Sequence, residues 1–214
     1  MTRAEQQART RERLLDAAER VFARHGYGGA SIDLISSEAG YSKGAIYSNF
    51  ESKEAVFLEL LGVYMQRGMA DLERIVGAVP ADAASALSQW LETMRVDNDC
   101  LLLSTELQLH ARRNDTFAGA YYALQARQTR AIADCLKRLF DALAVPMPMD
   151  PIDLADSILA ITHGVTLQRP PTRPGGHSDA GHIIDELMKN FLQSGKSNTA
   201  PKSRRRDKLA PSRT

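Results

Sequence analysis

Small and hydrogen-bonding residues cluster between Ser42 and Asn49, where the chain reads Ser-Lys-Gly-Ala-Ile-Tyr-Ser-Asn. Around Ile46, which points inward, this stretch offers an outer face without the long acidic side chains of an ordinary solvated helix. A short helix with such a face can enter the major groove of DNA and bring its side chains to the base edges. The alternative is a helical hairpin whose polar face meets only water.

Two short helices around a tight turn would position this face. Ser31 can cap the first helix by accepting a hydrogen bond from a free backbone N–H, and Gly40 can end it in a left-handed conformation. Ser42 can cap the second helix, while Ile46 and Phe50 turn its inner side toward the core. The pattern predicts a helix-turn-helix over about residues 31–50.

Residues that suggest catalysis or metal binding are few. Glu106 and His110 are four positions apart, which would place them on one helix face, but no third ligand follows at a telling distance. His163 lies within an apolar helical pattern, as a hydrogen-bonded core histidine does. The chain has no glycine-rich phosphate loop, nucleophile elbow or paired-cysteine site. We therefore expect no catalytic residue, no metal and no cofactor.

The composition favours a globular protein of a reducing cytoplasm. Of the 214 residues, 43% are hydrophobic and 25% are charged, which is ordinary for a globular chain. No apolar run approaches the ~20 residues of a membrane span, and the polar N-terminus does not read as a secretory signal. The two cysteines, Cys100 and Cys135, form no disulfide framework.

Hydrophobic residues recur at helical spacing through most of the chain, and no strand pattern occurs. Residues Met1–Thr10 are expected to be a flexible arm whose arginines either reach DNA phosphates or stay in solvent. A first helix should run from Arg11 to Gly26, and a long helix, Ser52–Val79, should follow the helix-turn-helix. Further helices are expected over Asp82–Val96, Leu101–Arg113, Asp115 to about Ala144 (with Asp115 as its cap), Pro151–Gln168 and Ser178–Ser194.

Charge is unevenly distributed, although the formal net charge is only +1. From Gly195 onward, seven basic residues accompany a single acid and almost nothing apolar, so residues 195–214 are expected to form a disordered basic tail. Such a tail either attracts DNA phosphate nonspecifically or merely solubilises the chain. The first sixty residues hold eight basic and nine acidic residues, so DNA binding there would depend on where the bases lie.

The N-terminal quarter of the chain resembles the DNA-binding domain of the TetR family of bacterial transcriptional regulators, over some fifty consecutive residues. Leu34, Ser36 and Asn49 depart from the usual residues of the family, which affects base preference rather than the domain. The pieces that carry the resemblance are Leu14-Leu15-Asp16-Ala17-Ala18, Phe22, Gly26-Tyr27, Ser31-Ile32, Ile35, Ala39-Gly40-Tyr41-Ser42-Lys43-Gly44, Ile46-Tyr47, Phe50 and Ser52-Lys53-Glu54.

The resemblance implies an all-α protein in which a three-helix DNA-binding domain precedes a helical ligand-binding and dimerisation domain. The implied bounds are residues 1–56 for the arm and DNA-binding domain and 57–194 for the second domain. The implied function is a homodimeric repressor that binds a palindromic operator and is released by a small, largely apolar or aromatic ligand. The alternative is an all-helical enzyme or small-molecule carrier with a purely structural N-terminal hairpin.

Three sets of site residues are expected. Those at the DNA are Ser31, Ser42, Lys43, Gly44, Ala45, Tyr47, Ser48, Asn49 and Lys53, with Tyr47 and Lys53 on phosphates. Those of the ligand pocket, implied by similar regulators, are Trp90, Met94, Glu106, His110, Tyr121, Tyr122 and His163. The last two helices are too apolar for one packed face each, so a second face should pair with a two-fold copy through Ile158, Val165, Ile184, Leu187, Met188 and Phe191.

Overall fold

The structure is a computed structural model that describes residues 2–77, 85, 88, 98–168 and 179–199. Every regular element in this described part is a helix, which confirms the all-α fold class. The predicted helix Asp82–Val96, which includes Trp90 and Met94, lies almost wholly outside the described residues. The helices are α1 (Arg3–Gly29), α2 (Ile32–Ala39), α3 (Lys43–Tyr47), α4 (Lys53–Val76), α6 (Asn98–Ala111), α7 (Asp115–Ala142), α8 (Pro151–Gln168) and α9 (Asp179–Thr199).

Helix α1 begins at Arg3, so the predicted flexible arm over Met1–Thr10 is wrong. Thr2 starts the helix with a capping box: its Oγ1 accepts from Glu5 N–H at 3.2 Å, and its own N–H donates to Glu5 Oε2 at 2.7 Å. Two free backbone donors of the first turn are thereby satisfied. The arginines expected on a mobile arm are instead carried by a helix.

Other predicted bounds need smaller corrections. Asn114, not Asp115, caps α7, because Asn114 Oδ1 accepts from Phe117 N–H at 3.2 Å. Helix α3 is shorter than predicted and ends at Tyr47, and α9 continues to Thr199. The first five residues of the predicted disordered tail are therefore helical, while residues 200–214 lie outside the described residues.

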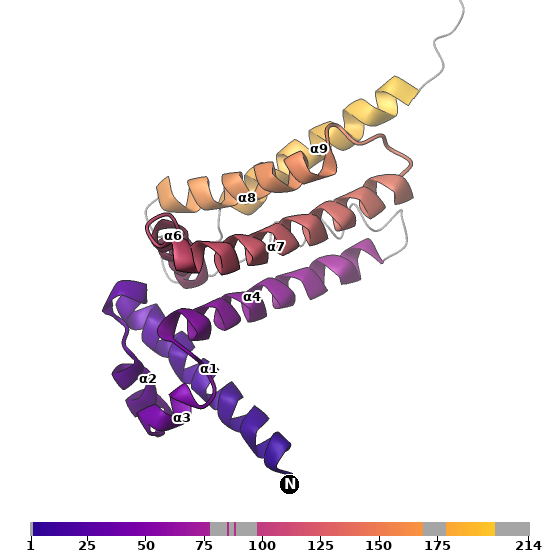
Figure 1. The fold of residues 1–214 in the computed structure, drawn as a ribbon. Helices are drawn as coiled ribbons and strands as arrows, with labels where there is room; N and C mark the ends of the chain where they lie inside the picture. Colours follow the sequence, from indigo (N-terminus) through magenta and orange to yellow (C-terminus); the bar gives the residue numbers. More distant parts are fainter. Residues whose placement is uncertain (1, 78–84, 86–87, 89–97, 169–178, 200–214) are drawn as a thin grey trace, which may run out of the picture.

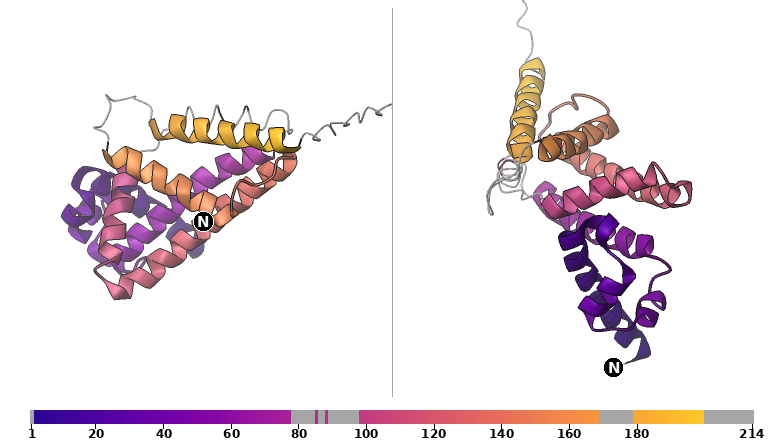
Figure 2. Two further views of the ribbon diagram at one scale, coloured as in Figure 1. Left: turned by 90° about the horizontal axis from the view of Figure 1, so that it is seen from above. Right: turned by 90° about the vertical axis from the view of Figure 1, so that its left-hand side faces the viewer.

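The helices form a layered body with the helix-turn-helix at one end (Figures 1 and 2). Helices α2 and α3 lie beside the middle and the C-terminal half of α1, at the end of the molecule opposite to α9. The long helix α4 leaves this region and packs along α7, which packs against α8, and α9 packs against α8 in turn. Among the described residues, no helix is long and apolar enough to cross a membrane.

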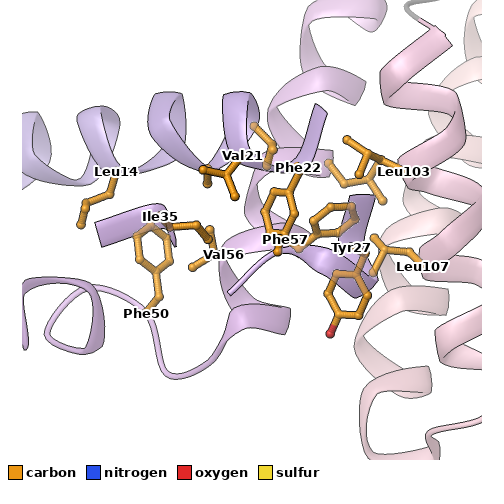
Figure 3. Packing of buried hydrophobic residues seen from close by; sticks show 14 of the residues in the cluster. Leu14, Val21, Phe22, Tyr27, Ile35, Phe50, Val56, Phe57, Leu103 and Leu107 are labelled. Carbon is orange, nitrogen blue, oxygen red and sulfur yellow. The ribbon is translucent and has the colours of Figure 1, made fainter. Parts of the chain in front are cut away.

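One hydrophobic core joins the N-terminal helices to the body behind them (Figure 3). Phe22 of α1 and Phe57 of α4 meet edge to face, with ring centroids 4.4 Å apart. Leu103 and Leu107 of α6 pack into the same cluster, together with residues of α7. The apolar packing therefore continues across the domain boundary that the sequence suggested after residue 56.

A second core holds the body together at its far end. It combines the last turns of α4, represented by Leu72 and Ile75, with α7, α8 and α9. Phe140 of α7 and Ile184 of α9 are almost fully buried within it. Helix α4 thus has one end in each core, which makes it a continuous element between the helix-turn-helix and the α8–α9 pair.

Candidate nucleic-acid interface

The helix-turn-helix forms as the sequence predicted. Ser31 Oγ caps α2 by accepting from Leu34 N–H at 3.2 Å, and Ser42 Oγ caps α3 by accepting from Ala45 N–H at 3.2 Å. Between them, Gly40 adopts a left-handed conformation with φ 68°, in which glycine avoids a Cβ clash. The two serine caps and the left-handed Gly40 therefore define where α2 ends and α3 begins.

The outer face of α3 is exposed. The Tyr47 side chain is 58% exposed, and Lys43 and Gly44 are exposed beside it. The Lys43 ammonium pairs with the Asp33 carboxylate of α2, but both side chains are about 60% solvent-accessible. An exposed ion pair of this kind contributes little to stability, so Lys43 can exchange its carboxylate partner for a phosphate or a base at small cost.

The packing within the chain leaves room for a side chain at Gly44. A Cβ added at Gly44 would meet only Ser42 Oγ, at an ordinary contact distance of 3.6 Å, and the backbone does not need a positive φ there. The packing of the chain therefore accepts alanine at this position. The fold does not require glycine at position 44. Close approach of another molecule to α3 would require it, because glycine has no side chain.

The side chains of Ser48 and Asn49 donate hydrogen bonds to a backbone carbonyl of their own helix. Ser48 Oγ donates to Ala45 O at 2.9 Å, and Asn49 Nδ2 donates to the same carbonyl at 2.7 Å. Both side chains thereby cap the end of the short helix. Their predicted contacts with DNA stay predictions. Ser48 Oγ could use its remaining lone pairs, whereas Asn49, whose Oδ1 is buried, would have to exchange its bond to Ala45 O.

Lys53 is bound within the chain. Its Nζ donates to Tyr27 O at 2.9 Å and Ala30 O at 3.0 Å, and it lies 4.2 Å from the centroid of the Tyr27 ring. An ammonium group has three donors, so one remains for the phosphate contact expected from the sequence. The structure adds a role that the sequence did not suggest, which is to fasten the end of α1 to the start of α4.

Arg11 is a structural residue that sequence reasoning missed. Its Nε donates to Glu59 Oε1 at 2.7 Å, its Nη1 donates to Asn49 O, and its guanidinium lies 4.2 Å from the centroid of the Phe50 ring. Arg11 therefore holds the segment after α3 against α1 and α4. The partners are 38 and 48 residues away along the chain, so no local pattern could have revealed them.

The predicted pocket residues fall in different places. Trp90 and Met94 lie outside the described residues. Tyr121 is buried and Tyr122 is 45% exposed, while His163 of α8 has its Nδ1 2.8 Å from Leu159 O and its Nε2 3.5 Å from Ser104 Oγ of α6. Glu106 and His110 instead reach the end of α1. The pocket assignment stays a prediction, and two of its residues, Glu106 and His110, have partners at the end of α1 and the start of α4.

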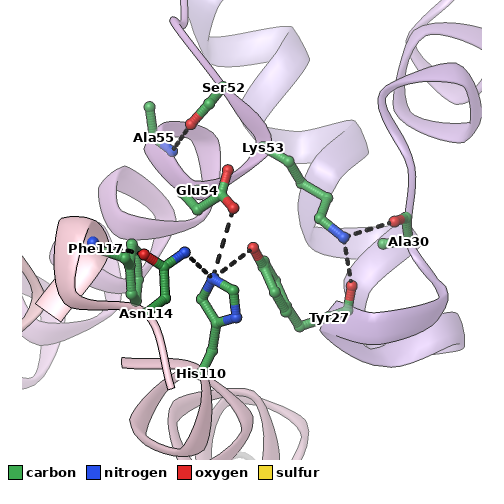
Figure 4. Close-up of polar contacts among 9 residues, drawn as sticks. All are labelled: Tyr27, Ala30, Ser52, Lys53, Glu54, Ala55, His110, Asn114 and Phe117. Atoms are coloured by element: carbon green, nitrogen blue, oxygen red, sulfur yellow. Dashed lines mark hydrogen bonds and ion pairs between the residues drawn. The ribbon is translucent and has the colours of Figure 1, made fainter. Parts of the chain in front are cut away.

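These partners form a polar cluster where the end of α1, the start of α4 and the end of α6 meet (Figure 4). His110 Nε2 lies 3.5 Å from each of three atoms: Glu54 Oε1, Tyr27 Oη and Asn114 Nδ2. The imidazole also lies against the rings of Tyr27 and Phe117, at centroid distances of 4.9 and 5.0 Å. We call these residues, with Lys53 and Glu106, the α1–α6 junction.

Burial and hydrogen bonding shift the pKa values of two junction residues, Tyr27 and Glu54. Burial raises the pKa of the Tyr27 phenol far above its ordinary value, and the nearby Glu54 carboxylate raises it further. Burial alone would raise the pKa of Glu54, but hydrogen bonds from its own backbone N–H, Ser52 and Tyr27 leave that pKa below its ordinary value. At neutral pH the phenol therefore donates and the carboxylate accepts.

Five of the six residues expected to form a dimer interface line a groove between α8 and α9. Ile158, Ile184, Leu187, Met188 and Phe191 line it. Ile184 and Met188 are already buried within one chain, whereas Leu187 is 39% exposed. Val165, further along α8, is half-buried and does not line the groove. The exposed apolar residues of this groove are therefore Leu187 and, at 41% exposure, Met149.

A capped helix-turn-helix with an exposed, small-residue second helix, mounted on a helical body, defines the class of helix-turn-helix DNA-binding proteins. A family model described as bacterial regulatory proteins of the tetR family matches residues 14–60, which span the core of this unit. The structure superposes on a TetR-family transcriptional regulator from Mesorhizobium loti with a TM-score of 0.69, at 21% identity, covering 91% of this chain and 98% of that chain. A TetR-family regulator from Rhodococcus sp. also gives 0.69, at 18% identity, covering 86% and 99%.

The chain is also similar in sequence to known helix-turn-helix transcriptional regulators. The chain is 34% identical over 119 residues to the transcriptional repressor NicS of Pseudomonas putida, covering 52% of this chain and 56% of NicS. It is 28% identical over 127 residues to the repressor AcnR of Corynebacterium diphtheriae, covering 48% and 67%, and 38% identical over 65 residues to YerO of Bacillus subtilis, covering 30% and 22%. The matches span only between 22% and 67% of the length of these relatives.

Residues 14–60 of the chain are a helix-turn-helix domain of the TetR family of bacterial transcriptional regulators, and the chain has the fold of TetR-family structures. This confirms the resemblance that the motif pieces between Leu14 and Glu54 predicted. It is a family of regulators and not of enzymes, so the alternative of an all-helical enzyme is set aside.

Proposed function

We propose that the protein is a homodimeric repressor that binds a palindromic operator in bacterial DNA through the exposed face of α3. The observation that carries the proposal is Gly44, whose size the fold does not require. NicS and AcnR are named as transcriptional repressors, which supports repression rather than activation. A regulator of this kind works in the cytoplasm, on the double-stranded DNA of its own cell.

The proposed contacts divide between bases and phosphates. Lys43, Ala45 and Ser48 would meet base edges, with Ser42, Gly44 and Asn49 beside them. Tyr47, Lys53 and Ser31 would hold phosphates, Ser31 from the N-terminus of α2, where free backbone N–H groups and the helix dipole favour an anion. Phosphate contacts fix the position of α3, and base contacts give sequence preference.

Replacing Gly44 by alanine should separate folding from DNA binding. The free energy of unfolding should stay equal or rise by up to about 1 kcal/mol, because alanine favours a helix over glycine. Operator affinity should fall roughly tenfold or more, because the added methyl group keeps α3 from the base edges. The operator would first be selected from random DNA, and affinity then measured by fluorescence anisotropy.

The matched control is Gly68→Ala, on the exposed side of α4, where an added Cβ meets nothing within 4 Å. This variant should gain similar helix stability and bind the operator as the wild type does. Equal operator affinity for Gly44→Ala and Gly68→Ala would refute the proposed interface, and failure to select any sequence from random DNA would refute the proposed function.

We further propose that residues 57–194 bind a small, largely apolar or aromatic effector and form the dimer. An effector shifts the equilibrium only through different affinities for the DNA-competent and incompetent arrangements. Helix α4 has one end in each core, so a small displacement of α4 by a ligand would move α3. Two recognition helices would then no longer match successive major grooves.

Operator DNA should weaken effector binding by the factor by which the effector weakens operator binding. A coupling of ~1–3 kcal/mol corresponds to roughly 5–150-fold in both directions. Trp90, the single tryptophan of the chain, allows apolar and aromatic compounds to be screened by fluorescence. A compound that binds with the same affinity in the presence and absence of operator is not an effector by this mechanism.

A further inference from the structure

Helix α1 contains one backbone break, at Gly26. Its φ of 66° and ψ of 176° lie in a region that essentially only glycine occupies. The break separates the long part of α1 from a last turn that begins at Tyr27. The backbone N–H of Tyr27 donates to the Glu106 carboxylate of α6. The end of α1 is therefore bound directly by the helical body.

The Glu106 carboxylate lies against bare backbone. A Cβ added at Gly26 would stand 2.8 Å from Glu106 Oε1 and 3.1 Å from Oε2. Glycine at position 26 thus serves two needs at once, the unusual backbone conformation and the space for the carboxylate. A hydrogen bond from an N–H to an ionised acceptor is roughly twice as strong as a neutral one.

The opposite end of the same turn is bound by Lys53, whose Nζ donates to the carbonyls of Tyr27 and Ala30. A carboxylate at the N–H end and an ammonium at the carbonyl end both match the direction of the peptide dipoles. Lys53 stands at the start of α4, beside the helix-turn-helix, whereas Glu106 belongs to α6. Glu106 is therefore the charged contact that joins this turn to the body.

His110, also on α6, makes polar contacts at this junction that are weaker than the Glu106 bond. His110 approaches Glu54 and Tyr27 only at 3.5 Å, at the limit of a hydrogen bond. Glu106 is itself an exposed residue, so water can replace its carboxylate if the bond breaks. Loss of this bond should therefore leave the fold intact, because the apolar core around Phe57 and Leu107 remains, and change mainly the direction in which the helix-turn-helix is held.

We propose that Glu106 is a positioning residue that sets the orientation of the helix-turn-helix on the helical body, and hence the distance between the two recognition helices of a dimer. The proposal rests on the proposed function, because the distance between two recognition helices affects binding only when a dimer binds a palindrome. Glu106 touches no DNA in this role and acts through the backbone of Tyr27.

The test compares one half-site with two. From the selected operator, one duplex carries a single half-site, and a series of palindromes carries half-sites moved apart or together by single base pairs. For Glu106→Ala, affinity for the single half-site should equal that of the wild type. Affinity for the best palindrome should fall roughly tenfold or more, because the dimer loses one charge-assisted bond in each protomer, and the preference for one spacing should broaden.

Two further variants make the comparison specific. Glu106→Gln keeps a side-chain oxygen that can accept from Tyr27 N–H, so it should recover most of the palindrome affinity and the spacing preference. Glu73→Ala removes an exposed carboxylate from the distant part of α4 and should behave as the wild type. Thermal melting of all variants confirms that each is folded.

An unchanged palindrome affinity and spacing profile for Glu106→Ala would overturn the proposal. A parallel loss on half-site and palindrome would also overturn it, because it would show that Glu106 supports the local fold of the helix-turn-helix. Failure of the wild type to prefer any palindrome would overturn the proposed dimeric function itself, and the two failures are therefore distinguishable.

Discussion

Replacing Leu187 by aspartate should convert the proposed dimer to a monomer and remove tight operator binding. Leu187 is 39% exposed in one chain and lines the apolar groove between α8 and α9. A second copy that covers this edge would have to bury the new carboxylate without a partner, which is strongly unfavourable. A monomer holds only one half-site, so operator affinity should fall on the order of 10²–10⁴-fold.

Sedimentation velocity at micromolar concentration, followed by operator titration, measures both effects. His182→Asp introduces the same side chain at an exposed position on the side of α9 away from the groove, and it should remain a dimer. A Leu187→Asp protein that sediments as a dimer, or a wild-type monomer that still binds the palindrome tightly, would contradict the α8–α9 interface.

Replacing Gly26 by alanine should destabilise the protein by about 3 kcal/mol. Two costs combine: a backbone conformation that alanine rarely adopts, on the order of 1–3 kcal/mol, and a methyl group placed 2.8 Å from Glu106 Oε1. The Glu106 side chain can swing into solvent to relieve the second cost, so the first should dominate. Urea denaturation followed by circular dichroism measures the change.

Gly28 provides the control two residues later. It has no positive φ, and a Cβ added there meets nothing within 4 Å. Gly28→Ala should therefore leave the free energy of unfolding unchanged or raise it by up to about 1 kcal/mol. If the two alanine variants unfolded at the same urea concentration, the break in α1 would not be the constraint that its dihedral angles indicate.

The helix-turn-helix was predictable because short-range signals specify it. Ser31, Gly40 and Ser42 act on backbone groups within a few residues of themselves. Ile46 is buried where the helical period places it, and Phe50 is buried as predicted although α3 ends before it. The errors in helix bounds also have local causes. The Thr2–Glu5 capping box was present in the sequence and could have shown that α1 begins at Arg3.

The α1–α6 junction was not predictable by the same means. Glu106 and His110 were correctly placed on one helix, but their partners at Tyr27 are 79 and 83 residues away along the chain. Helical periodicity shows that two residues share a face and leaves open which helix that face meets. For the same reason, Lys53 could be assigned to a phosphate from the sequence without any sign of its bonds to Tyr27 and Ala30.

The continuous apolar core has a practical consequence for building chimeric regulators. In a chimera that joins residues 1–56 to the helical domain of another regulator, Phe22 and Tyr27 would face a foreign surface. In this protein they pack in one cluster with Leu103, Leu107 and Phe117. A transplanted unit should therefore carry the α1-facing positions of α6 and the first turn of α7 with it. A chimera designed in this way transfers the helix-turn-helix domain together with the residues of α6 and α7 that pack against it.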